Sequence, residues 1–201
     1  SAHNVFNWLS RQIDTSKMDD VNSGHKVKII DSINWTQVLN KKWELNPVIP
    51  FNDTIFSTLT DLLAVVDSNA NIILKGGIYD YPVAFINKKN IYISAPNEPA
   101  YFLIPDNKST IFTIKSSENI ILHNLYFKHA LPYCELSANV IDIINSRKIT
   151  INHCYLNGSG IIGLFAENTN GILFQDNIIE ECKSYAVLLN HCKSVILAKN
   201  L

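Results

Sequence analysis

The sequence predicts an all-β solenoid, a parallel β-helix of about five to six coils. Its composition is rich in strand and corner formers, with 28 Ile and 24 Asn among 201 residues, which favours many short strands joined by tight turns. A repeated apolar pattern runs through the second two-thirds of the chain, and a fixed period decides an architecture before local propensities do. The elements of this pattern are taken below in order.

The repeat is anchored by segments that run polar, then apolar-x-apolar. The anchors are Ile91, Ile120, Ile149, Ile172 and Val195. Two longer intervals between them, of about 29 residues, are followed by two shorter ones, of about 23 residues. A weaker copy begins at Ile72, ahead of the first anchor. Each anchor predicts one strand, so the chain winds through one coil per repeat.

Two further apolar columns share the same period. Eight residues before the anchors lie Val83, Phe112, Ile141, Leu164 and Val187. Seven residues after the later anchors lie Phe127, Leu156 and Ile179. A repeat of about 23 residues that contains three strands is too short for a βαβ unit or a propeller blade. Its length suits one coil of a parallel β-helix. Equivalent strands should then stack about 4.8 Å apart.

Asparagine marks the corner that follows the anchor strands. Asn177 and Asn200 lie five residues after their anchors, where we expect a left-handed backbone and the stacking of Asn on Asn. Leu125 and Cys154 interrupt this row at the same position. The four cysteines (Cys134, Cys154, Cys182 and Cys192) form no CxxC pair, so we expect them to be packing residues.

The repeat has an opening of its own. Residues 57–67 have the spacing of an amphipathic helix with Ser57 as N-cap, and Asn71-Ile72-Ile73-Leu74-Lys75-Gly76-Gly77-Ile78-Tyr79 follows. With the repeat, this opening resembles the right-handed parallel β-helix, or pectin-lyase-like, superfamily, and is similar to that of alginate-lyase and chondroitinase-type polysaccharide lyases. The resemblance covers roughly residues 53–201. It implies a helical cap before the β-helix and an extracellular or periplasmic location.

Residues 1–52 do not repeat and form a separate flank. Short helices are expected near residues 5–13 and 33–39, and Trp8, Trp35 and Trp43 must be buried against something. The outward positions of the anchor strands form a mostly apolar stripe: Ile73, Tyr92, Ile121, Thr150, Leu173 and Ile196. We expect the amino-terminal segment or a partner to cover this stripe. The alternative is that the stripe is a substrate face.

The last coil stops just after its anchor, which predicts a fragment of a longer helix or self-association end to end.

Composition excludes several classes of function. Because 47% of residues are hydrophobic and 17% charged, the chain can bury a core and is not disordered. Seventeen Lys and Arg nearly balance 18 Asp and Glu, which argues against nucleic acid as a partner. No run approaches the roughly 18 apolar residues of a membrane span. No signal segment opens the chain, although one could have been removed earlier.

The resemblance implies that a catalytic site, if present, lies in a groove on the outer face of the sheet that precedes the anchor strands. That face has two outward columns, Ala84-Thr113-Asp142-Phe165-Leu188 and Ile86-Lys115-Ile144-Glu167-Asn190. An insertion over 128–139, with a counterpart over 97–107, is expected to form a wall beside this face or to be a solvated loop pair. Outward Tyr126 and Tyr155, with Ile178, could stack on sugars or simply pack as a sheet column.

The candidate residues follow from the chemistry of uronic acids. A lyase must neutralise the substrate carboxylate and remove the adjacent proton, and Lys115, Arg147 and His191 could do such work, with Asp142 and Glu167 orienting them or binding a cation such as calcium. The catalytic candidates are therefore Lys115, Asp142, Arg147 and Glu167, and the substrate-binding candidates are Tyr133, Phe165, Asn190 and His191. No set of metal ligands and no cofactor motif is evident.

Two hypotheses remain open from the sequence. The first is a polysaccharide lyase-like protein that binds an acidic polysaccharide; a glycoside hydrolase would instead use Asp142 and Glu167, whose Cα atoms should lie about 8 Å apart. The sequence has no Gly-His-Gly, no paired Asp-Asp on the expected strand and no clear Lys-plus-Arg signature of the catalytic subfamilies. The second hypothesis is therefore a non-catalytic module for adhesion, assembly or glycan binding.

Overall fold

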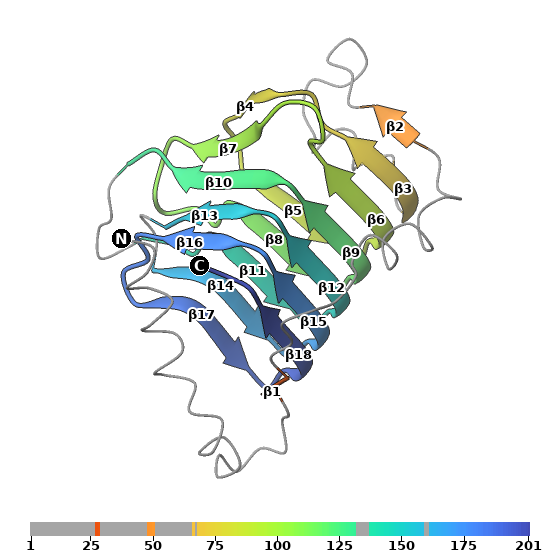
Figure 1. The fold of residues 1–201 in the computed structure, drawn as a ribbon, viewed down its shortest axis with the longest axis vertical. Helices are drawn as coiled ribbons and strands as arrows, with labels where there is room; N and C mark the ends of the chain where they lie inside the picture. Colours follow the sequence, from red (N-terminus) through yellow and green to blue (C-terminus); the bar gives the residue numbers. More distant parts are fainter. Residues whose placement is uncertain (1–26, 29–47, 51–65, 67, 132–136, 159–160) are drawn as a thin grey trace.

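The protein is a parallel β-helix of about five coils, built from three sheets that the chain visits in rotation (Figure 1). The computed structural model describes residues 27–28, 48–50, 66, 68–131, 137–158 and 161–201. Within each sheet every strand pairs in parallel with its equivalent in the next coil. The three-strand coil predicted from the repeat is therefore confirmed.

The sheets are named here A, B and C. Sheet C contains β5 (Val83–Ile86), β8 (Phe112–Lys115), β11 (Ile141–Ile144), β14 (Ile162–Glu167) and β17 (Tyr185–Asn190). Sheet A follows it along the chain, with β3 (Ser68–Ile73), β6 (Lys89–Ser94), β9 (Glu118–His123), β12 (Arg147–Asn152), β15 (Asn170–Gln175) and β18 (Lys193–Ala198). Sheet B completes each coil, with β4 (Gly77–Tyr79), β7 (Ala100–Ile104), β10 (Leu125–His129), β13 (Tyr155–Asn157) and β16 (Ile178–Glu180).

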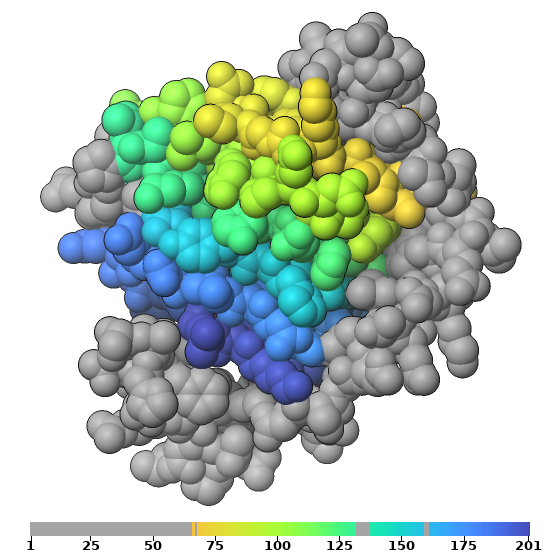
Figure 2. Space-filling model, turned by 45° about the horizontal axis from the view of Figure 1, so that its top comes forward, coloured from red at the N-terminus to blue at the C-terminus, as the bar shows by residue number. Residues whose placement is uncertain are grey.

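The predicted columns lie in register along the axis. In sheet C the paired file runs Val83, Phe112, Ile141, Leu164 and Val187. The anchors pair in sheet A in the predicted order. The third column is also present, and Phe102 and Tyr79 extend it into the earlier coils. Figure 2 shows the result on the surface as bands of colour that follow one another in chain order.

Aromatic side chains fill the middle of the interior. The rings of Tyr79, Phe102 and Phe127 stack along the axis, with centroids 5.2 Å apart at each step. Phe112 meets both Phe102 and Phe127 edge to face at 5.7 Å. Phe102, Phe112 and Phe127 are fully buried, and burying one such ring contributes about 2–3 kcal/mol. The core therefore depends on the coil register, because each ring packs against residues from neighbouring coils.

The first coil is offset from the sequence prediction. Ala70, not Ile72, pairs with the anchor Ile91, so the first repeat begins two positions earlier than expected. The outward partner of Tyr92 is consequently Asn71, and Ile73 pairs with Ser94 instead. The prediction followed the larger side chain, but the left-handed backbone of Asn69 sets the register as Asn90 does one coil later. A small alanine therefore occupies the anchor position.

The corners between sheets A and B also differ from the prediction. The left-handed residues lie one position earlier than expected, at Asn124, His153, Asp176 and Lys199. Asn177 points inward and is fully buried; its Oδ1 accepts from the Cys154 amide at 2.9 Å, and its Nδ2 donates to the Ile151 carbonyl at 2.9 Å. Asn200 repeats this, donating to the Phe174 carbonyl at 2.9 Å. The side-chain amides of Asn177 and Asn200 thus hydrogen-bond to backbone groups of the turns. The left-handed backbone conformation belongs to the residue before each of them.

Only part of the expected wall is an insertion. Residues 100–104 of the proposed counterpart form strand β7, and the extra chain of that coil lies mainly at Ala95–Pro99, between sheets A and B. In the next coil β10 extends to His129, whose buried ring has Nε2 2.9 Å from the Ser109 carbonyl oxygen. The two coils therefore do not carry equivalent insertions, because an apolar strand of period two fills most of the earlier one.

The helical cap and the helices predicted within the flank 1–52 lie outside the described residues. Two short strands of that flank are described: β1 (Val27–Lys28) pairs with β18, and β2 (Val48–Pro50) pairs with β3, at opposite edges of sheet A. The outward stripe of this sheet is half-buried to buried, with Ile121 4% and Leu173 7% exposed. Which segment covers it is a prediction that falls on residues outside those described.

Two remaining features concern thiols and membranes. Cys154 and Cys192 are buried, Cys182 is half-buried, and none of the three is in a disulfide. Burial raises the pKa of Cys154 to about 12 and that of Cys182 to about 11, so these thiols stay protonated, as packing residues should. In the described part of the chain no helix has the length and apolar character needed to cross a membrane.

Candidate functional site

The outer face of sheet C presents the two predicted columns. Their paired files are Ala84-Thr113-Asp142-Phe165-Leu188 and Ile86-Lys115-Ile144-Glu167-Asn190. Inward positions of β5, β8 and β11 are buried, whereas these positions are half-buried or exposed. The strand alternation thus brings five of the sequence-predicted site residues onto one face: Lys115, Asp142, Phe165, Glu167 and Asn190.

Asp142 is the most constrained carboxyl group on this face. Asn139 Nδ2 donates to its Oδ1 at 2.8 Å, and Thr110 Oγ1 donates to its Oδ2 at 3.0 Å. Both donors belong to the segments that lead into β8 and β11. Desolvation raises the pKa of Asp142, while the two hydrogen bonds act in the opposite direction and are the smaller effect. A carboxyl group with a raised pKa is better suited to act as a general acid than one with an ordinary pKa.

Glu167 is the second carboxyl group near Asp142. Asp142 pairs with Phe165, and Glu167 follows Phe165 by two positions, so both acids point outward from adjoining strands. Standard strand spacings place their Cα atoms about 8 Å apart. That Cα spacing is compatible with the carboxyl separation that inverting glycoside hydrolysis requires.

Lys115 is the cation of this face. It ends β8, is exposed, and shares a column with Glu167, from which it is separated by Ile144. The positive group of Lys115 therefore lies two strands from Glu167 and one strand from Asp142. It could bind an anionic substituent of a bound sugar.

The other predicted site residues lie elsewhere. Arg147 begins β12 of sheet A, and its Nη2 donates to Glu118 Oε2 at 2.6 Å, so its charge is directed at a neighbouring coil. His191 is an exposed corner residue with a φ of 52° between β17 and β18. Tyr133 lies outside the described residues.

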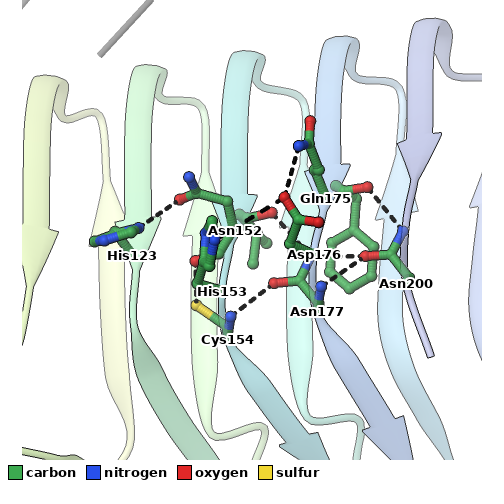
Figure 3. Close-up of polar contacts among 10 residues, drawn as sticks. His123, Asn152, His153, Cys154, Gln175, Asp176, Asn177 and Asn200 are labelled. Carbon is green, nitrogen blue, oxygen red and sulfur yellow. Dashed lines mark hydrogen bonds and ion pairs between the residues drawn. The ribbon is translucent and has the colours of Figure 1, made fainter. Parts of the chain in front are cut away.

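A second polar column, which sequence reasoning missed, lies on the outer face of sheet A (Figure 3). Its members share the position three residues after each anchor: Ser94, His123, Asn152 and Gln175. His123 Nδ1 lies 3.1 Å from Asn152 Oδ1, and Gln175 Nε2 donates to Asp176 Oδ2 at 2.6 Å. Recurrence of polar residues at a fixed distance from the anchor was the signal that could have found this column.

The chemistry of this column is that of neutral hydrogen bonding. Desolvation lowers the pKa of His123, and the neighbouring His153 lowers it further. Because the Asn152 oxygen only accepts, Nδ1 of a neutral His123 carries the proton and Nε2 is an acceptor. Asn152 Nδ2 and Gln175 Oε1 are buried at paired positions without a hydrogen-bond partner. One is a donor and the other an acceptor, and they belong to adjoining strands.

The outer face of sheet B carries a tyrosine column. Tyr101, Tyr126 and Tyr155 pair in register, with ring centroids 5.0 and 5.7 Å apart. The middle ring is therefore packed between its two neighbours. Tyr155 also donates its hydroxyl to Glu180 Oε2 at 2.8 Å. These contacts favour ordinary sheet packing over an open platform for sugar rings.

No protein-family model and no curated protein sequence matches this chain. Among solved structures, one described as a "putative glycosyl hydrolase" from Parabacteroides merdae resembles it with a TM-score of 0.53 and 9% sequence identity. The likeness covers 89% of this chain and 94% of that one. At this level of identity the likeness is one of fold.

Proposed function

We propose that this protein is a carbohydrate-active β-helix that binds an acidic polysaccharide along the outer face of sheet C. The observation that carries the proposal is the half-buried, hydrogen-bonded carboxyl group of Asp142, whose pKa is raised, beside Glu167 on the adjoining strand. The fold it shares with a protein described as a "putative glycosyl hydrolase" supports the same class of activity. A location outside the cytoplasm, where such polymers are met, belongs to this proposal.

Glycosidic hydrolysis is the chemistry that the two carboxyl groups support best. Asp142, whose pKa is raised by desolvation, donates a proton to the leaving oxygen, and Glu167 activates a water molecule on the other side of the bond. Phe165 and Asn190, on the same face, contact the sugar through its ring and its hydroxyls. Lys115 pairs with an acidic substituent of the polymer.

Elimination is the second candidate, because Lys115 shares a column with Glu167. In that case Lys115 neutralises the uronate carboxylate, and a neighbouring base removes the proton next to it. Arg147 is a weaker candidate for this step than the sequence implied, since it begins β12 of sheet A and does not belong to the outer face of sheet C.

The test is incubation with alginate, pectin, chondroitin and a neutral glucan, following both new reducing ends and ultraviolet absorbance of unsaturated products. Hydrolysis yields reducing ends alone, and elimination yields both signals. Asp142→Asn and Glu167→Gln should each lower the rate at least a hundredfold, the lower end of a general acid-base contribution. Glu98→Gln, at an exposed position between sheets A and B, is the matched control and should leave the rate unchanged. If no polymer of the panel yields product although binding is measurable, the protein is a glycan-binding module and not an enzyme.

A further inference from the structure

The corner between sheets C and A carries an ordered row of charged side chains. The row consists of the first residue of each sheet A strand, and these residues pair with one another in register from coil to coil. In order they are Ser68, Lys89, Glu118, Arg147, Asn170 and Lys193. All are exposed except Glu118, which is half-buried. We call this set the corner row.

The backbone beneath the corner row is held in a regular arrangement. A left-handed residue follows every member of the row, as in Asn90, Asn119 and Lys148, and another precedes most of them by two positions. Inside the corner a ladder of hydroxyls links the coils. Ser117 Oγ accepts from the Lys88 amide at 3.1 Å, and Ser146 Oγ accepts from the Ser117 amide at 3.1 Å. Adjacent members of the row are therefore about 4.8 Å apart along the axis.

Charge alternates along this row. Lys89, Arg147 and Lys193 begin strands β6, β12 and β18, while Glu118 and Asn170 begin the strands between them. Glu118 is bridged by Arg147 at 2.6 Å and by Lys148 at 3.4 Å, and these contacts lower its pKa. Positive side chains thus recur on every second coil, about 10 Å apart, and a carboxylate or an amide occupies the coils between.

From this alternation we infer that the corner row binds an anionic glycan that carries one acidic group on every second sugar. Two coils match the length of a disaccharide in an extended glycan lying along the axis. A polymer with an acid on every sugar would bring carboxylates opposite Glu118 and Asn170, which offer no cation. The inference rests on the proposed function only for the class of ligand, and it names a second surface beside the outer face of sheet C.

The spacing favours a glycan over nucleic acid. Double-stranded DNA carries a charge about every 1.7 Å of its axis, far denser than three cations about 10 Å apart. The chain also has a formal net charge of −1, so no large positive field extends beyond the corner. The sparse, regular cations suit a sparse, regular polyanion.

Binding of size-matched hyaluronan, polygalacturonate and dextran at low salt tests the inference. Hyaluronan has one carboxylate per disaccharide, polygalacturonate one per sugar, and dextran none. The wild-type protein should bind hyaluronan most tightly and dextran least. The triple variant Lys89→Gln, Arg147→Gln, Lys193→Gln should lose about tenfold or more in hyaluronan affinity. The matched control, Lys108→Gln, Lys128→Gln, Lys199→Gln, removes three exposed lysines away from the row and should retain it.

Two outcomes overturn the inference: equal affinity for polygalacturonate and hyaluronan, or equal losses in the two triple variants. Binding of a DNA duplex as tight as that of hyaluronan would also contradict it. Asp142→Asn separates this inference from the proposed function. That variant is followed by its rate of glycan cleavage and the corner-row triple variant by its hyaluronan affinity, so a failure of catalysis on sheet C and a failure of the corner row give different results.

Discussion

Asp142 shows how neighbouring chain segments change the chemistry of one side chain. Its carboxyl group occupies a strand position that would normally face water, but the segments containing Thr110 and Asn139 approach it closely enough to donate hydrogen bonds. The loss of water contact outweighs these bonds, so the pKa of Asp142 is raised. The acid is poised for proton transfer because of its surroundings, not because of its residue type.

The raised pKa of Asp142 predicts a pH dependence of stability. The native state binds this proton more tightly than the unfolded state does, so its contribution is complete below the ordinary value of 3.8 and is lost as pH rises through the native pKa. Asp142→Asn should remove this loss, so the urea midpoint should depend less on pH across the acid range above pH 3.8.

Glu118→Gln should change the pH dependence in the opposite sense. Because Arg147 lowers the pKa of Glu118, the contribution of Glu118 to stability is present above pH 4.5 and is lost on acidification. Identical pH profiles for the two variants would contradict both assignments.

At the corner between sheets C and A, asparagine occupies several positions with a left-handed backbone. Asn69, Asn90 and Asn119 have left-handed backbones and form a ladder, in which Asn90 Nδ2 donates to Asn69 Oδ1 at 2.8 Å and Asn119 Nδ2 donates to Asn90 Oδ1 at 2.6 Å. Lys148 occupies the next position with a φ of 57°. Most side chains disfavour this conformation, and asparagine tolerates it better.

Lys148→Asn should therefore raise the free energy of unfolding by about 1 kcal/mol, by relieving the backbone and extending the ladder by one amide. Its exposed contact with Glu118 at 3.4 Å is a small loss. Urea denaturation measures the change. Lys193→Asn, at a position whose φ is not positive, is the control and should give no gain. A gain of equal size in both variants would point to a charge effect instead.

The inward side-chain amide of Asn177 stabilises the corner between sheets A and B, and replacing it tests that role. Its side chain satisfies the Cys154 amide and the Ile151 carbonyl inside the protein, so Asn177→Ala leaves both backbone groups buried without a partner. We expect a loss of about 2 kcal/mol in the free energy of unfolding, with Asn177→Asp retaining only the acceptor. An alanine variant as stable as the wild type would mean that water replaces the amide in solution.

At the scale of the whole molecule, stability is a sum over stacked coils. Leu164 is fully buried between Ile141 and Val187 in the interior file, whereas Val187 in the last described coil of sheet C is half-buried. Each coil contacts mainly its neighbours, so equivalent residues differ in energy according to how many neighbours cover them.

Leu164→Ala should therefore cost about 2–5 kcal/mol, and Val187→Ala less than half as much. Chemical denaturation followed by far-ultraviolet circular dichroism gives both values. Ile141→Ala, one coil earlier and fully buried, should resemble Leu164→Ala and serves as the matched comparison. Equal costs at Leu164 and Val187 would contradict the stacked-coil description.

The repeat made most of the fold predictable, and the departures have local causes. Ile91, Ile120 and Ile149 could be aligned because large apolar residues recur at fixed intervals. Ala70 was missed because the same position is filled by a small residue, and the true marker was the left-handed Asn69 before it. The site was harder: alternation put Asp142 and Glu167 on one face, but it carried no information on which loop would approach them.

The sequence by itself determined the strand columns, the three-sheet coil and which residues point outward, because these depend on spacing along the chain and on side-chain alternation. Only the tertiary structure decided the environment of those residues. Asp142 is desolvated and hydrogen-bonded to Thr110 and Asn139, Arg147 is turned to Glu118 on the preceding coil, and His123 is joined to Asn152 on the following one. Charge state and hydrogen bonding depend on neighbours in space, and those are set when the coils stack.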